Sequence, residues 1–266
     1  MQKTKSKNIT LSNYLLNKKK KNEKILLAFL PAFYPDHETF LELVDYLLNN
    51  GVDALELGFP SLDAKKDGKT IREANKKVIS NGFQAADYFE LAAEINKNYK
   101  FKRLAAMGYW QDFKKYIKAD YQQQWQQAGI KDLILPDLKG DKNINLIRNN
   151  GFNLIPFLDS VEKIESFVPG DEAFIYCPTH SGKTGTDNDF DLKLLQDLKS
   201  ALAESELAAK PHLAGFGISR AEDVKKIMEL DYDGVIVGSE FINKINQDFT
   251  AAVQFLDELK TALNKV

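Results

Sequence analysis

Hydrophobic residues along this chain form short apolar runs that alternate with segments of helical periodicity. The first run, residues 25–30, is unbroken, as in a strand that is buried on both faces. Behind it, five apolar residues between Phe40 and Leu48 recur at three- and four-residue spacing. This spacing predicts an amphipathic helix, which ends at Asn50-Gly51. The same unit of apolar run, loop and amphipathic helix then repeats along the chain.

Eight such runs predict eight strands, at residues 25–30, 54–57, 103–107, 133–135, 154–157, 173–177, 213–216 and 235–237. Helical patterns separate them at residues 70–98 in two pieces, 113–128, 144–149, 161–167, 192–207 and 221–229, and a last one covers 249–263. Strands that alternate with helices build a parallel sheet. Even spacing without a break in composition favours one closed (β/α)₈ TIM barrel, an α/β fold of a single domain over residues 1–266, rather than a doubly wound sheet. A further helix at residues 12–19, with Ser12 as its N-cap, is expected to cover one end of the barrel.

Composition narrows the functional classes. Hydrophobic residues make up 44% and charged residues 28% of the 266 residues, as is usual for a globular protein. The net charge is −2, so the chain as a whole has no positive electrostatic field that would attract nucleic acid or an anionic membrane. The single cysteine, Cys177, excludes an internal disulfide, and three scattered histidines lack the spacing of metal ligands. The basic N-terminal residues precede only a short apolar run, so neither a signal peptide nor a membrane span is expected. We expect a cytoplasmic protein.

The clearest candidate chemistry follows the second predicted strand. Glu56 lies inside a short apolar run that ends at Gly58 and Pro60, so its carboxyl group is expected to be desolvated and its pKa raised. Asp63 and Asp67 follow in the loop. Two carboxyl groups in different surroundings can serve as an acid and a base near pH 7. The alternative is a core Glu56 paired with a lysine, beside a solvated loop, because structural ion pairs also perturb pKa values.

Three glycine-containing turns follow the last three predicted strands, at residues 181–185, 215–219 and 238–239. Glycine allows backbone N–H groups to approach an anion closely, and a helix that begins at Ser239 would present the positive end of its dipole. TIM barrels often bind phosphate between the loops that follow strands seven and eight. These turns therefore predict a phosphate site, unless the glycines serve only to permit tight turns.

With Leu-Glu-Leu-Gly-Phe-Pro at 55–60, Asp67-Gly68, and the three glycine turns in this order, the chain resembles the tryptophan synthase alpha subunit family over almost its whole length. The segment Leu135-Pro136-Asp137-Leu138 is similar to the end of the family's fourth strand. The resemblance implies retro-aldol cleavage of indole-3-glycerol phosphate to indole and glyceraldehyde 3-phosphate. It implies no metal and no organic cofactor.

Residue by residue, Glu56 and Asp67 fall on the family's catalytic Glu and Asp. A carboxyl group near indole C3 can transfer the protons of bond cleavage, and a carboxylate beside the indole N–H stabilises the charge that develops there. The resemblance implies that Thr184 closes over the site and forms a hydrogen bond with Asp67. The positions that the resemblance assigns to substrate binding are Phe29, Tyr176, Thr184, Gly185, Phe216, Gly217, Gly238 and Ser239.

The loops around the predicted barrel mouth depart from the family pattern. Residues 61–69 lack two prolines and a phenylalanine, residues 107–112 replace Met-x-Tyr-x-Asn-Pro, Lys139 replaces a proline, and His180 replaces an arginine. The loop at 61–69 should therefore be more mobile and more charged. In the resemblance these loops contact a beta subunit in an alpha₂beta₂ complex. Two alternatives stay open: a catalytically weak member that mainly binds and activates a beta subunit, or another phosphate-binding barrel lyase or isomerase.

Overall fold

The computed structural model describes residues 10–98, 103–180 and 191–264. Its strands are β1 (Ile25–Pro31), β2 (Ala54–Gly58), β3 (Leu104–Met107), β4 (Asp132–Ile134), β5 (Asn153–Ile155), β6 (Ile175–Pro178), β7 (His212–Gly215) and β8 (Gly234–Val237). The helices in the first half are α1 (Leu11–Lys20), α2 (His37–Asn49), α3 (Lys69–Ser80), α4 (Ala85–Lys97), α5 (Trp110–Phe113), the 3₁₀ helix η1 (Ala119–Tyr121) and α6 (Gln122–Ala128). Those in the second half are α7 (Asp141–Asn149), α8 (Val161–Ser166), α9 (Leu192–Glu204), α10 (Ala221–Glu229), α11 (Ser239–Gln247) and α12 (Phe249–Leu263).

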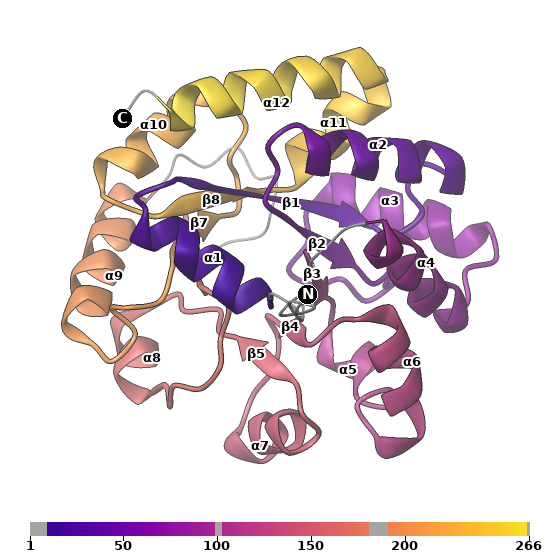
Figure 1. The fold of residues 1–266 in the computed structure, drawn as a ribbon, viewed down its shortest axis with the longest axis horizontal. Coiled ribbons are helices and arrows are strands. Elements are labelled where there is room, and N and C mark those ends of the chain that lie inside the picture. The colour runs from indigo at the N-terminus through magenta and orange to yellow at the C-terminus, as the bar shows by residue number, and fades with distance from the viewer. Residues whose placement is uncertain (1–9, 99–102, 181–190, 265–266) are drawn as a thin grey trace, which may run out of the picture.

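The eight strands form one parallel sheet in the order β5-β4-β3-β2-β1-β8-β7-β6. Its two edges meet beyond the end of β5, where Tyr176 N–H donates to the Pro156 carbonyl and Leu158 N–H donates to the Tyr176 carbonyl, each at 3.0 Å. The helices surround this sheet (Figure 1). The predicted (β/α)₈ barrel is thus confirmed.

Alternation along each strand divides the buried residues into two clusters, because successive side chains point to opposite faces of a sheet. On β1, Leu27 and Phe29 belong to the cluster inside the barrel, and Ala28 and Leu30 belong to the cluster between the barrel and the helices. Burial on both faces accounts for the unbroken apolar runs in the sequence. The same alternation places Glu56 on the inner face of β2.

Helix α1 covers the N-terminal ends of the strands (Figure 1), as predicted. Its Lys18 lies 2.6 Å from Asp53, just before β2, and its Lys19 lies 3.0 Å from Asp233, just before β8. The predicted N-cap was wrong: Thr10, not Ser12, accepts the N–H of Asn13 at 3.2 Å. The earlier start adds Leu11 to the first turn, where it packs inside the barrel end with Leu15.

The prediction of one helix over residues 113–128 was also wrong. The chain forms α5, η1 and α6 instead, with a turn at residues 114–118. Trp125 donates its indole N–H to the carbonyl of Tyr116 at 2.7 Å and stacks on Phe113, with ring centroids 5.8 Å apart. These tertiary contacts override the helical periodicity. No helix of the described residues is long and apolar enough to span a membrane.

Candidate active site

Glu56 is a buried acid on the inner face of β2. Its register neighbours are Phe29 on β1 and Ala105 on β3, and it is 0% exposed. Neither carboxyl oxygen has a hydrogen-bond partner among the described residues. Burial without compensation disfavours the carboxylate, and it raises the pKa of Glu56 to about 8. At neutral pH this group is therefore mainly a protonated acid that can donate.

Asp67 ends the loop that follows β2, next to Gly68, the N-cap of α3. It is 4% exposed. Desolvation raises the pKa of Asp67 to about 7, although a hydrogen bond with Tyr109 and the charge of Arg72 act in the opposite direction. The two predicted catalytic carboxyl groups are thus both buried, and burial raises the pKa of each to within about one unit of neutral pH. Asp63, the other loop acid, is exposed and pairs with Lys65 at 3.0 Å.

Tyr109 is a site residue that sequence reasoning missed. Its hydroxyl oxygen accepts the N–H of Lys66 at 3.0 Å, and the same hydroxyl hydrogen-bonds the carboxyl group of Asp67. The signal available in the sequence was its position, two residues beyond Met107 at the end of β3, since barrel chemistry gathers in the loops after strand C-termini.

Both carboxyl groups line one cavity at the C-terminal mouth of the barrel. It has a volume of about 20 Å³, room for about one water molecule. A larger ligand therefore requires its lining side chains to move. The lining residues are Phe29, Glu56, Asp67, Ile71, Met107, Tyr176, Phe216, Gly217, Ile218, Ile236, Gly238 and Ser239. All predicted site residues within the described chain are in this set, and Thr184 and Gly185 lie outside the described residues.

The Phe29 ring lies between two glycines of the neighbouring strands: Gly58 ends β2, and Gly238 follows β8. A Cβ atom added to Gly58 would lie 2.8 Å from the ring, and one added to Gly238 would lie 3.1 Å from it. Both distances are shorter than ordinary van der Waals contact. Gly238 thus permits close packing of Phe29 as well as the turn into α11.

Tyr176 of β6 is buried beside the two acids. Its pKa is raised well above the ordinary value, first by desolvation and then by the charges of Glu56 and Asp67. A Cβ atom on Gly215 would lie 2.5 Å from the Tyr176 hydroxyl oxygen. The Tyr176 ring also contacts Phe216, with centroids 5.5 Å apart. Tyr176 therefore forms an aromatic wall of the cavity.

The predicted phosphate end of the cavity contains the N-terminus of α11. Its N-cap, Gly238, makes no side-chain capping bond, so the N–H groups of the first turn are available to an anion. By contrast, Asp223 already accepts the N–H groups of Ser219 and Arg220, each at 3.0 Å, at the start of α10. The start of α11 is therefore the better anion site.

The turn after β7 has an unusual backbone. Phe216 and Gly217 both have positive φ angles, 74° and 80°. Glycine adopts such angles readily, whereas a bulky residue such as Phe216 is strained there. The carbonyl of Phe216 accepts the hydroxyl of Thr179, and this bond ties the turn to β6. Strain of this kind is typical of functional sites.

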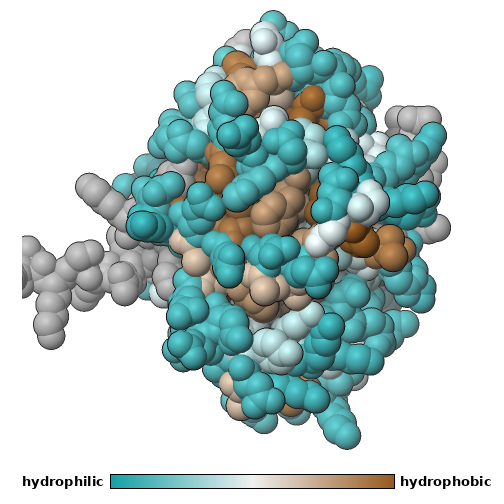
Figure 2. Space-filling model, turned by 90° about the vertical axis from the view of Figure 1, so that its right-hand side faces the viewer, coloured by the Kyte–Doolittle hydropathy of each residue, from teal (hydrophilic) through white to brown (hydrophobic). Residues whose placement is uncertain are grey.

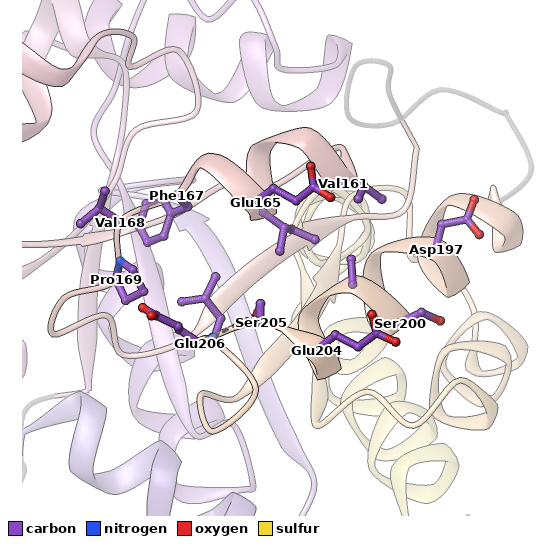
Figure 3. A pocket seen from close by; sticks show the side chains of 13 residues that line it. Val161, Glu165, Phe167, Val168, Pro169, Asp197, Ser200, Glu204, Ser205 and Glu206 are labelled. Atoms are coloured by element: carbon purple, nitrogen blue, oxygen red, sulfur yellow. Dashed lines mark hydrogen bonds between the residues drawn. The ribbon is translucent and has the colours of Figure 1, made fainter.

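A larger depression lies between α8 and α9, with a volume of about 870 Å³. Figure 3 shows its four acids, Glu165, Asp197, Glu204 and Glu206, spread around an apolar floor rather than converging on one point. It lacks the buried, converging groups of a catalytic site. Within the described ranges, no group of three or more His, Cys, Asp or Glu side chains could hold a metal ion.

Comparisons with known proteins identify the family of this chain. The family model described as tryptophan synthase alpha chain matches residues 15–266. The chain is 32% identical to the tryptophan synthase alpha chain of Dehalococcoides mccartyi, over 91% of this chain and 96% of the relative. It is 28% identical to that of a Thermoanaerobacter species, over 93% and 94%.

Solved structures share the fold. A structure from Aquifex aeolicus has a TM-score of 0.82 at 25% identity and covers 96% of this chain and 99% of its own. Tryptophan synthase subunit alpha from Legionella pneumophila has a TM-score of 0.79 at 23% identity, over 96% of this chain and 98% of its own. At that identity the second likeness concerns the fold alone.

Proposed function

This chain belongs to the tryptophan synthase alpha chain family, and from this premise we propose that it cleaves indole-3-glycerol phosphate to indole and glyceraldehyde 3-phosphate. The observation that carries the proposal is the pair Glu56 and Asp67, two buried carboxyl groups with raised pKa values that line one cavity. The reaction needs proton transfer and charge stabilisation, which two carboxyl groups can supply.

Glu56 is proposed as the proton-transfer group. With a pKa of about 8 it is protonated at neutral pH, so it can donate to indole C3 as the carbon–carbon bond weakens. The resulting carboxylate can then take the proton of the glycerol hydroxyl group. Its position on a buried strand fixes the carboxyl group, and fixed geometry is what proton transfer requires.

Asp67 is proposed to stabilise the positive charge that develops on the indole ring. Protonation of C3 makes the ring N–H more acidic, and a carboxylate beside it lowers the energy of that state. Tyr109 supports this role, because a hydrogen bond to the charged form favours the carboxylate. Phe29, Tyr176 and Phe216 would hold the ring between aromatic surfaces.

The substrate phosphate is proposed to bind the backbone of Gly217, Gly238 and Ser239, with Gly185 at the rim and Thr184 closing over Asp67. The uncapped start of α11 supports this assignment. We propose in addition that the chain acts as one domain in the cytoplasm, and that its partner is a tryptophan synthase beta subunit in an alpha₂beta₂ complex.

One observation favours a second candidate function. A cavity of about 20 Å³ is far smaller than the several hundred Å³ typical of ligand pockets, so the isolated chain must rearrange before it can bind substrate. A weakly active subunit that mainly binds and activates a beta subunit would have such a site. Indole release by the purified chain, measured with and without the beta subunit of the same organism, tests both proposals. Release that Glu56→Gln removes supports the lyase; stimulation of the beta subunit without indole release supports the second candidate.

A further inference from the structure

A separate pocket lies on the outside of the barrel between α2, α3 and α4, with a volume of about 230 Å³. Figure 2 shows the side of the molecule that is on the right in Figure 1, where apolar residues are visible among hydrophilic ones. The pocket is lined by Phe33, Asp36, His37, Val78, Asn81, Gly82, Phe83 and Asp87. Helix α3 separates it from the active-site cavity: Ile71 lines the cavity, and Val78, two turns further along, lines the pocket.

The pocket has an aromatic interior. The rings of Phe33 and Phe83 have centroids 6.1 Å apart, and the ring of His37 meets Phe33 edge-on at 5.4 Å. Val78 is buried beneath them. Phe33 and Phe83 are only half-buried. Half-exposed rings in a concave site fit a flat aromatic ligand, which adds an offset or edge-on ring contact.

Its charged groups are acidic. Asp36 accepts the N–H of Thr39 at 2.9 Å and Asp87 accepts the N–H of Gln84 at 2.8 Å, so each carboxylate caps a helix. A carboxylate has about four lone-pair sites, and these bonds leave acceptor capacity at both groups.

The carboxylates of Asp36 and Asp87 are the acidic groups that line the pocket. Among the described residues, no lysine or arginine lines it. The pKa of Asp36 is lowered mainly by its bonds to Thr39, and the charge of Lys77 contributes less. His37 is turned toward Glu94, with its Nε2 atom 3.4 Å from that carboxylate. The groups that face the pocket therefore favour a cationic ligand.

We propose that this pocket binds a flat aromatic compound that carries a protonated amino group. The ring packs against Phe33 and Phe83, and the ammonium group donates to Asp87 and Asp36. No step of the lyase reaction uses these residues, so the site is distinct from the proposed catalytic site.

The test titrates the full chain with three probes of the same ring system: tryptamine, indole and indole-3-acetate. Changes in backbone amide chemical shifts in NMR spectra report binding at each site: the amide of Gly82 reports on this pocket, and the amide of Gly217 reports on the active site. We expect tryptamine to shift Gly82 with a Kd at least five-fold lower than that of the neutral or anionic probe. Glu90→Gln, an exposed charge removal on the same helix, should leave this Kd unchanged, whereas Asp87→Asn should raise it at least three-fold while its amide oxygen still caps α4.

Asn81→Trp provides a second variant, because a large side chain at the exposed rim fills the pocket, while the backbone N–H through which residue 81 caps α3 is kept. It should abolish the tryptamine shift at Gly82. The proposal is overturned if Gly82 does not respond, if indole-3-acetate binds as tightly as tryptamine, or if Asp87→Asn and Glu90→Gln behave alike. None of these readings uses indole release, so failure here and failure of the proposed activity are distinguishable.

Discussion

The hydroxyl group of Tyr109 joins the backbone of Lys66 to the carboxyl group of Asp67. It accepts from the first and, since a carboxylate can only accept, donates to the second. The two proposed catalytic acids are therefore held in different ways. Glu56 is fixed by a strand that is buried on both faces, whereas Asp67 lies in a loop and is held there by the hydroxyl group of Tyr109.

The first prediction concerns this phenol. Tyr109→Phe removes a bond that favours the Asp67 carboxylate, so the pKa of Asp67 should rise above about 7. If it rises by one unit, the carboxylate fraction at pH 7, and with it kcat/KM, falls roughly five-fold. The rising limb of the pH–rate profile should move to higher pH. Tyr232→Phe is the control. It removes a buried hydroxyl group that donates to the Leu195 carbonyl at 2.9 Å, in the cluster between the barrel and the helices, and it should not move that limb.

The unaltered chain should show a narrow, bell-shaped pH dependence of kcat/KM. Activity rises as Asp67 loses its proton near pH 7, and falls as Glu56 loses its proton near pH 8. A stopped indole assay from pH 5.5 to 9.5 measures both limbs. Activity that keeps rising beyond pH 9 would contradict the role of Glu56 as the proton donor.

Glu56→Gln should lower the rate of indole release by on the order of 10²-fold or more. The amide keeps the shape of the side chain but transfers no proton. The matched control is Asp132→Asn, which removes another buried strand acid with a raised pKa of about 6, on β4. Asp132 is outside the cavity and should be dispensable for turnover. Equal activity of a folded Glu56→Gln variant and the parent chain would exclude the proposed role.

The same substitution should change stability. The pKa of Glu56 is about 8 in the folded chain, whereas the ordinary value of an exposed glutamate is 4.5, so between these pH values the folded state holds a proton that the unfolded state has lost. The free energy of unfolding of the parent chain should therefore fall as pH rises from about 4.5 to about 8, by about 1.4 kcal/mol per pH unit. Urea unfolding at pH 5 and pH 8 should show a smaller loss in Glu56→Gln. A parallel pH dependence in the two proteins would contradict the burial of an ionisable group at this position.

A carboxylate at the start of α11 should repel the substrate phosphate. Ser239→Asp is expected to raise KM at least ten-fold with little change in kcat, because the charge faces the N–H groups proposed to bind the anion. Ser239→Ala keeps those N–H groups and should have a small effect. A sulfate or substrate phosphate found elsewhere on the barrel in a crystal structure would refute the assignment.

The sequence carried enough information for the barrel and for the residues that line its mouth. Strands buried on both faces leave unbroken apolar runs, and Glu56 interrupts one of them, so burial and a raised pKa could be predicted together. Strand ends were placed within one or two residues, as is usual where backbone pairing rather than composition decides the boundary.

Features that depend on contacts between distant segments could not be read in this way. The break between α5 and α6 follows from the packing of Trp125 on Phe113 and Tyr116. The bond between Tyr109 and Asp67 joins loops 42 positions apart, and the narrow cavity results from side chains of six strands and their loops. Hydrophobic periodicity describes one helix or strand at a time, so it cannot predict the helix break, the bond between the loops or the size of the cavity.

The last prediction concerns the loop that follows β2. Its Leu62 is 72% exposed, and we expect that docking of a beta subunit covers this side chain. A partner that binds the loop in one conformation would also reduce the entropy lost when Asp67 is positioned. We therefore expect indole release by the chain alone to be low and to rise when its own beta subunit is added.

Leu62→Asp should remove most of this stimulation and leave the basal rate unchanged. The control is Val168→Asp, because Val168 is equally exposed, at 69%, but lies beside the depression between α8 and α9. The measurement is the rate of indole formation at saturating substrate, with each variant titrated by the beta subunit. If both variants are stimulated like the parent chain, Leu62 is not part of the interface. If the parent chain alone is as fast as in the complex, positioning of Asp67 does not depend on a partner.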